Sequence, residues 1–145
     1  MSLILYDSLR IELEIDKDNQ WFAFIWVELG NRKALVRFKI DTGCNSLVIS
    51  HKTLSALGYD SSLDSLANLP AIHGRLASGD KHPFGKLGKV SLSILQGPRM
   101  QICKANAVCH TTHETHDLLG TEIFKQFKGV SFCLTGEKYM EFTKT

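Results

Sequence analysis

The sequence has no hydrophobic run approaching the ~20 residues that a helix needs to span a bilayer. Its first apolar segment, Leu3-Ile4-Leu5-Tyr6, is too short for the apolar region of a secretory signal. The net charge is only +2, and the Lys and Arg residues are scattered, so composition gives no support to nucleic-acid binding. We therefore expect a soluble, cytoplasmic protein with neither a membrane nor a nucleic acid as partner.

Closely spaced cysteine pairs are also missing. None of the four cysteines belongs to a Cys-x-x-Cys motif. Because no secretion signal accompanies them, we interpret them as reduced and mostly buried thiols, and we expect no disulfide framework. They are Cys44, Cys103, Cys109 and Cys133.

What is present fits one packed domain over residues 1–145. The hydrophobic fraction is 43% and the charged fraction 22%, as in ordinary globular cores. The chain shows neither a long linker nor a tandem repeat.

Short alternating segments, typical of β-strands, make up most of the chain. Two short helices are expected over about 50–57 and 121–128, with Ser50 and Thr121 as N-caps. The stretch 59–68 fits either a loop or a weak helical turn. The fold class is therefore mostly β, with a closed or partly closed barrel and two short helices. Strands are expected over 9–15, 21–28, 35–40, 47–49, 71–77, 82–86, 89–94, 100–108, 130–134 and 138–142.

Asp41 stands at the end of the apolar strand 35–40 and is followed at once by Thr42 and Gly43. These are ordinary turn residues, and an aspartate can accept a hydrogen bond from the backbone two residues on. The apolar face of the strand, however, gives Asp41 a partly buried setting. A second apolar pair closed by glycine, Leu118-Leu119-Gly120, leads directly into the second expected helix. These neighbours favour a catalytic carboxylate over a plain turn.

In this order the segments resemble the single-lobe, retropepsin-like aspartic proteases of clan AA type. The family pattern is an apolar strand, Asp-Thr/Ser-Gly, a second apolar strand, a glycine-bearing flap hairpin, and two apolar residues with glycine before a helix. The resemblance covers roughly residues 20–143 and implies an acid-protease barrel. The matching segments are 36–40, Asp41-Thr42-Gly43, 47–49, the hairpin around Leu76-Ala77-Ser78-Gly79, and Leu118-Leu119-Gly120.

The resemblance implies an aspartic endopeptidase in which two aspartates share one proton across an activated water. This chain has a single Asp-Thr/Ser-Gly triplet, so the pair requires a two-fold homodimer in which Asp41 of each copy meets the other. By the family pattern, Thr42 would hydrogen-bond across the axis and Gly43 would let backbone approach the carboxylates. No cofactor and no nucleophilic Ser or Cys is needed.

The remaining roles also follow from the resemblance. Ala77, Ser78 and Gly79 would form the flap tip and bind an extended peptide or protein substrate. The segment Leu118-Leu119-Gly120 would brace the Asp41 loop from behind. The last strand, 138–142, is expected to join the dimer sheet.

Two residues depart from the family pattern. Cys44 stands where Ala or Ser is usual, and we interpret it as a small packing residue, with redox sensitivity as the alternative. Thr121 follows Leu-Leu-Gly where retroviral members carry arginine, which points away from a viral enzyme. The N-terminal strand within residues 1–15 lies outside the minimal pattern.

Two other functions stay open. One is a catalytically inactive retropepsin-like module for dimerisation or peptide binding. The other is a metal-binding domain that uses the loop His110–His116, although zinc sites usually take four ligands, often from two separated pairs. A solvated polar loop is the competing interpretation. We interpret His73 and His82 as surface residues of the flap.

Overall fold

The structure, a computed structural model, describes residues 8–75, 81–95 and 99–144. Within them no helix is long and apolar enough to cross a membrane. The strands are β1 Ser8–Glu12, β2 Glu14–Ile15, β3 Trp21–Leu29, β4 Arg32–Ile40, β5 Leu47–Val48, β6 Ala71–Arg75, β7 Lys81–Leu95, β8 Arg99–His110, β9 Leu118–Leu119, β10 Gly129–Cys133 and β11 Tyr139–Thr143. The helices are α1 His51–Ala56, α2 Leu63–Ala67 and α3 Thr121–Phe124.

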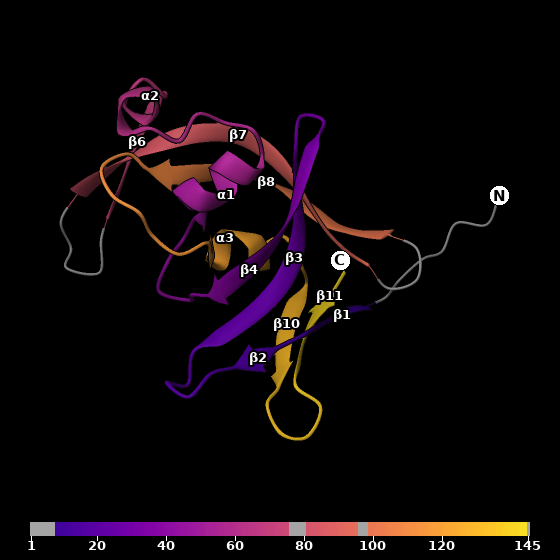
Figure 1. Ribbon diagram of the computed structural model, residues 1–145. Helices are drawn as coiled ribbons and strands as arrows, with labels where there is room; N and C mark the ends of the chain where they lie inside the picture. The colour runs from indigo at the N-terminus through magenta and orange to yellow at the C-terminus, as the bar shows by residue number, and fades with distance from the viewer. Residues whose placement is uncertain (1–7, 76–80, 96–98, 145) are drawn as a thin grey trace.

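Six strands form a closed barrel (Figure 1). From β3 the ring runs through β4, β9, β5, β8 and β7, and β7 pairs with β3 to close it. The strands β2 and β6 extend this sheet outside the ring. The predicted fold class, mostly β with a closed barrel, is confirmed.

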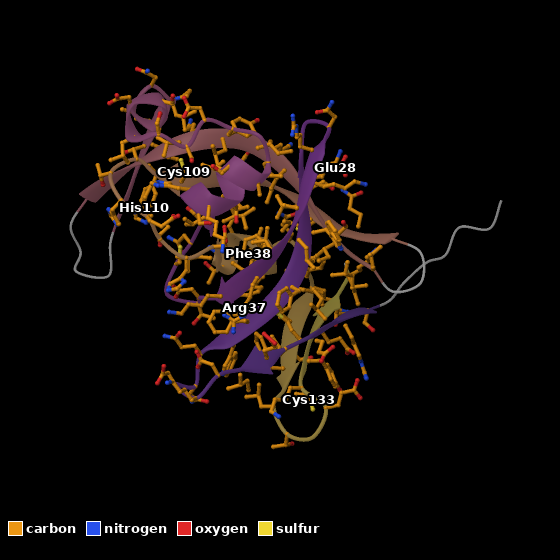
Figure 2. The ribbon with its side chains drawn as sticks, in the orientation of Figure 1. Glu28, Arg37, Phe38, Cys109, His110 and Cys133 are labelled. Carbon is orange, nitrogen blue, oxygen red and sulfur yellow. The ribbon has the colours of Figure 1, made fainter. Side chains whose placement is uncertain are left out.

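The barrel core follows from the alternation of β4. Val36, Phe38 and Ile40 are buried, whereas Arg37 between them faces outward (Figure 2). Such large apolar side chains each contribute roughly 1.5–3 kcal/mol when fully buried. Burial of these side chains in the barrel core therefore fixes the position of β4, which leads to Asp41.

A second, three-stranded sheet has the order β1, β11, β10. The predicted single strand 9–15 divides between the two sheets, because β1 pairs with β11 and β2 pairs with β3. Between them, the Leu13 backbone N–H donates to the Lys138 carbonyl at 3.0 Å. The apolar alternation is unbroken, since Leu9, Ile11 and Leu13 are all buried, but the chain changes partners.

Two predicted strand boundaries are wrong. The glycines at 85 and 88 do not separate two strands, since β7 runs through both and absorbs a shift of register between Lys86 and Gly88. Gly88 has a φ of 91°, which glycine adopts without strain, so the irregularity is a bulge. Strand β8 extends to His110 instead of ending at 108.

The helices follow prediction in part. Ser50 caps α1, because its side chain accepts from the Thr53 backbone N–H. The stretch 59–68, for which the sequence fitted either a loop or a weak helical turn, contains α2. The described residues therefore form three helices where two were predicted. The second predicted helix is shortened to α3, and its N-cap is Gly120, not Thr121, which is already helical and makes no side-chain cap.

Candidate active site

Asp41 directly follows β4, and its backbone N–H donates to the Leu119 carbonyl at 3.1 Å. A tight turn follows, in which the Gly43 N–H donates to Asp41 Oδ1 at 3.0 Å and the Cys44 N–H to the Asp41 carbonyl at 3.2 Å. Within residues 8–75, 81–95 and 99–144 the Asp41 carboxylate accepts no other hydrogen bond. The predicted turn therefore forms, and the second carboxylate oxygen of Asp41, Oδ2, is available for other contacts.

The pair Leu118–Leu119 lies between the strand that enters the Asp41 loop and the strand that leaves it. As β9 it pairs in parallel with Lys39 and Ile40 of β4, and antiparallel with β5. Leu119 is fully buried. A two-residue strand that is paired on both sides thus holds both ends of the loop in register.

Gly120 lies directly against the back of the loop. An added Cβ would collide with the Ser46 carbonyl oxygen and would lie 2.6 Å from the Cys44 carbonyl oxygen, so only glycine fits here. The first turn of α3 then donates to the loop, from Thr121 N–H to the Cys44 carbonyl at 2.9 Å and from Glu122 N–H to the Asn45 carbonyl at 2.8 Å.

This arrangement satisfies donors that a helix N-terminus leaves unpaired, and it fixes the loop backbone from behind. The Thr121 hydroxyl adds a bond to Asn45 Oδ1 at 3.2 Å. The segment Leu118-Leu119-Gly120 therefore lies where a brace of the Asp41 loop has to lie.

The outer side of the same loop faces solvent. Thr42 and Gly43 are exposed, and Asp41 is half-buried. Cys44 is half-buried, and its Sγ donates to the Ser46 carbonyl at 3.5 Å. Burial, reinforced by the nearby charge of Asp41, raises the pKa of the Cys44 thiol despite the bond to Ser46. A protonated thiol favours the packing interpretation over a reactive one.

The flap is described only at its base. The strand β6 and the first residues of β7 form an antiparallel pair that ends at Arg75 opposite Lys81. The predicted tip residues Ala77, Ser78 and Gly79 lie outside the described residues.

A second carboxylate, Asp117, was not singled out from the sequence. Its Oδ1 accepts the Ser50 N–H at 2.7 Å, and its Oδ2 accepts the hydroxyls of Ser50 at 3.1 Å and Thr53 at 2.9 Å. Burial raises the pKa of Asp117 against the opposing effect of these bonds. Its carbonyl also accepts the Lys39 N–H at 2.9 Å, so Asp117 ties α1 to β4 just before β9 begins.

Glu114 acts at the same helix end. Its carboxylate accepts the backbone N–H groups of His51 at 2.8 Å, Lys52 at 3.1 Å and Thr115 at 2.9 Å. Burial works against ionisation of Glu114, but these hydrogen bonds outweigh it and lower the pKa. The sequence predicted a helix N-terminus at Ser50, where Glu114 and Asp117 both bind. It did not show which distant side chains would reach that helix end.

The predicted polar loop, His110–His116, begins only after His110. Cys109 and His110 belong to β8 and are buried, and the His110 ring lies 4.6 Å from Phe84 and 4.4 Å from His113, centroid to centroid. In the part of the chain that the structure describes, no three His, Cys, Asp or Glu residues are grouped to hold a metal ion. The metal-binding hypothesis gains no support from this loop.

The strand β11 lies between β1 and β10, so both of its edges are paired within the chain. The expectation that the last strand joins a dimer sheet stays a prediction, and these pairings limit how the strand could do so. An added strand would have to pair with β10 or β1, with β11 as an inner strand.

A closed barrel in which an Asp-Thr-Gly loop is held between β4, β9 and β5 is a retropepsin-like fold. Over 100% of both chains the structure is similar to that of a retropepsin-like aspartic protease from Rickettsia conorii, with a TM-score of 0.57 and 17% sequence identity. At this identity the likeness shows the fold alone. No family model and no curated protein sequence matches the chain.

Proposed function

We propose that this chain is an aspartic endopeptidase that hydrolyses peptide bonds with an Asp41 pair contributed by two protomers of a homodimer. The observation that carries the proposal is the Asp41 loop. Its backbone is fixed from behind by β9, Gly120 and α3, while its outer side, with Thr42 and Gly43, is exposed. The fold shared with the Rickettsia protease supports the same reaction class.

The chemistry follows from bringing two such loops together. Two carboxylates ~3 Å apart cannot both ionise cheaply, so they hold one proton between them. The ionised Asp41 takes a proton from water, the water oxygen attacks the carbonyl carbon, and the protonated Asp41 gives its proton to the carbonyl oxygen, which forms a gem-diol. As the C–N bond breaks, the pair gives a proton to the leaving amine and takes one from a diol hydroxyl, which forms the carboxylic acid product and returns the pair to its starting state.

The loop geometry suits this role. The Gly43 N–H fixes the orientation of the Asp41 carboxylate through Oδ1 and leaves Oδ2 for water. Thr42 is exposed, so its hydroxyl can reach across a two-fold axis. The mechanism needs no cofactor.

The substrate in this proposal is an extended peptide or an unfolded protein. It would lie between the Asp41 pair and the hairpin of β6 and β7, with Ala77, Ser78 and Gly79 at the tip. We also propose a cytoplasmic location. All four cysteines are free, as is usual in a reducing compartment.

The test is cleavage of an unfolded protein at mildly acidic pH. The wild type should cleave and Asp41→Asn should not. Mixing the two variants sharpens the test, because a dimer needs both carboxylates. After subunit exchange, activity should fall with the square of the wild-type fraction. Equal activity of Asp41→Asn and the wild type would show the mechanism to be wrong, and a linear fall would show that each chain acts alone.

The second candidate is a catalytically inactive module for dimerisation or peptide binding. The observation in its favour is the Asp41–Gly43 bond, which a purely structural turn also makes. Such a module would dimerise or bind peptides and cleave none of them, with Asp41→Asn behaving as the wild type.

A further inference from the structure

The inference concerns a groove of about 530 Å³ whose lining residues include none from the Asp41 loop. Its floor is apolar and lies on the outer face of the barrel. Three large apolar side chains that line it are exposed, Phe24 at 45%, Leu35 at 51% and Leu95 at 59%, and Trp26 lies with them. A contiguous apolar patch on a protein surface commonly marks a place that another segment or molecule covers.

The groove lies where the two sheets separate. One side of β3 pairs with β4, and the other side pairs with β2 at Trp21 and Phe22 and with β7 from Trp26 to Glu28. Within the described residues no strand pairs with this second side of β3 at 23–25. β1 turns away from β3 to pair with β11, toward the side of the molecule where the β7–β8 hairpin ends (Figure 1). A wedge therefore opens between β1 and the end of β7.

One wall of the groove is the edge of a strand. Arg10, Ile11 and Glu12 are consecutive in β1, and all three line the groove. Because consecutive side chains of a strand point to opposite faces, the edge of β1 borders the groove. β1 is an outer strand of the three-stranded sheet, and an outer edge presents backbone groups to which an added strand can bind. The groove is therefore suited to an extended segment.

The charged residues that line the groove are Arg10, Glu12 and Glu14, and two of them already have partners. Arg10 is ion-paired with Glu141 at 2.6 Å, and Glu14 with Arg37 at 3.2 Å. The surface that the groove offers to a ligand is therefore mainly the apolar floor and the edge of β1. These features favour an apolar occupant over a charged one.

We propose that the chain's own segment Leu3-Ile4-Leu5-Tyr6 binds in this groove as an added strand along β1. The segment lies outside the described residues. Its four large and mainly apolar residues would span about 13 Å when extended. Only Asp7 separates the segment from Ser8, the first residue of β1, and aspartate favours turns. A reversal of the chain at Asp7 would lay the segment antiparallel to β1 and bring it to the groove.

The covalent connection favours this segment over a separate peptide. Binding of a tethered segment is intramolecular, with an effective concentration in the millimolar range for a short linker. In an extended strand Leu3 and Leu5 share one face, and Ile4 and Tyr6 share the other. Whichever face turns inward therefore presents two large side chains to the floor at Phe24. The contact lies within one chain, and it requires neither the Asp41 pair nor a second protomer.

The test measures how well the segment shields Trp26 in the full chain. The sequence has two tryptophans, so in a Trp21→Phe background the fluorescence comes from Trp26 alone, and acrylamide quenching reports its exposure. Serine substitutions in the segment should raise the quenching constant about twofold, because the segment then leaves the groove and water reaches the ring. The test variant combines three substitutions, Leu3→Ser, Ile4→Ser and Leu5→Ser.

The matched control is Leu63→Ser. Leu63 is 51% exposed in α2 and does not line the groove, so this variant should leave the quenching constant unchanged. Circular dichroism checks that both variants remain folded. If the segment variant and its parent are quenched equally, the segment does not cover the groove and the proposal is wrong.

Nuclear Overhauser effects test the contact directly. In the full chain, methyl protons of the segment should show effects to ring protons of Phe24 or Trp26. A mixture of isotope-labelled and unlabelled copies then separates contacts within a chain from contacts between chains. If the effects appear between copies, the segment of a second copy occupies the groove and the proposal is wrong. None of these measurements depends on whether Asp41 is catalytic.

Discussion

Two aspartates near β9 differ in how much of their bonding capacity the fold uses. Asp41, after β4, accepts one hydrogen bond on its carboxylate, from Gly43, and the turn that holds it is exposed. Asp117, just before β9, accepts three, from Ser50 and Thr53, in a setting that raises its pKa. Both lie beside the same two-residue strand, but at opposite ends of it.

The difference shows what makes a carboxylate available for chemistry here. Asp117 has its acceptors filled by the helix that it caps, so its removal would leave donors unpaired. Asp41 is positioned by backbone hydrogen bonds in which its side chain takes no part. Its own N–H donates to the Leu119 carbonyl, and the first turn of α3 donates to the carbonyls of Cys44 and Asn45. Its carboxylate can therefore change without loss of the loop. Under the proposed function, Asp41 has the catalytic role and Asp117 a stabilising one, and this contrast can be tested by substitution.

The largest expected effect is on activity. Asp41→Asn should lower the rate of peptide cleavage by about 10²–10⁴-fold, because it removes the acid–base function of the pair. The free energy of unfolding should stay near that of the wild type, since the Asn side-chain oxygen can still accept from Gly43. Substrate cleavage and urea unfolding measure the two quantities. A variant that unfolds easily would mean that Asp41 is structural, as Asp117 is.

Gly120→Ala should lower the free energy of unfolding by about 3 kcal/mol, because the new Cβ would overlap the backbone carbonyls of Ser46 and Cys44. Urea unfolding measures this loss. Gly129→Ala is the matched control, since nothing lies within 4 Å of a Cβ at Gly129. If both variants are equally stable, Gly120 does not hold the Asp41 loop and the backbone support inferred for Asp41 is wrong.

The sequence predicted the Asp41 side of this contrast better than the Asp117 side. The alternation of β4 and the triplet Asp41-Thr42-Gly43 are local patterns, and the structure shows that strand and that turn where they were expected. The placement of Leu118-Leu119-Gly120 came from the resemblance to a family. Nothing local could show that β9 inserts between β4 and β5.

What the sequence could not predict depends on pairing between distant segments. Residues 9–15 divide between two sheets, but their sequence does not show it. The apolar and polar residues alternate without a break, and the alternation continues past Leu13, where the chain changes its pairing partner. The role of Asp117 depends on a helix end 67 residues earlier in the chain. The N-cap of α3 is Gly120 instead of Thr121, because Gly120 has the extended backbone of a cap and its carbonyl accepts the Ile123 N–H at 3.2 Å.

Asp117→Ala should lower the free energy of unfolding by about 1–3 kcal/mol, because it leaves the Ser50 N–H and two hydroxyls without their acceptor. Asp18→Ala is the control, since Asp18 is exposed in a turn and should change stability by less than about 0.5 kcal/mol. Under conditions in which Asp117→Ala is still folded, its rate of peptide cleavage should remain close to that of the wild type. Loss of cleavage by a folded Asp117→Ala protein would break the division of roles.

The smallest effect is the pH dependence of stability, in which Glu114 and Asp117 should act in opposite directions. The folded state lowers the pKa of Glu114 below its ordinary 4.5, so its contribution is present above that pH and is lost as the pH falls through the folded value. The folded state raises the pKa of Asp117 above its ordinary 3.8, so acidification through that window favours folding.

The measurement is the free energy of unfolding of the wild type, Glu114→Gln and Asp117→Asn between about pH 6 and about pH 3. On acidification the wild type should lose its advantage over Glu114→Gln, and it should gain relative to Asp117→Asn. The Glu114 effect should stay below about 1 kcal/mol, because that side chain is largely exposed and its charge is screened. If both differences change in the same direction, burial does not outweigh hydrogen bonding at Asp117.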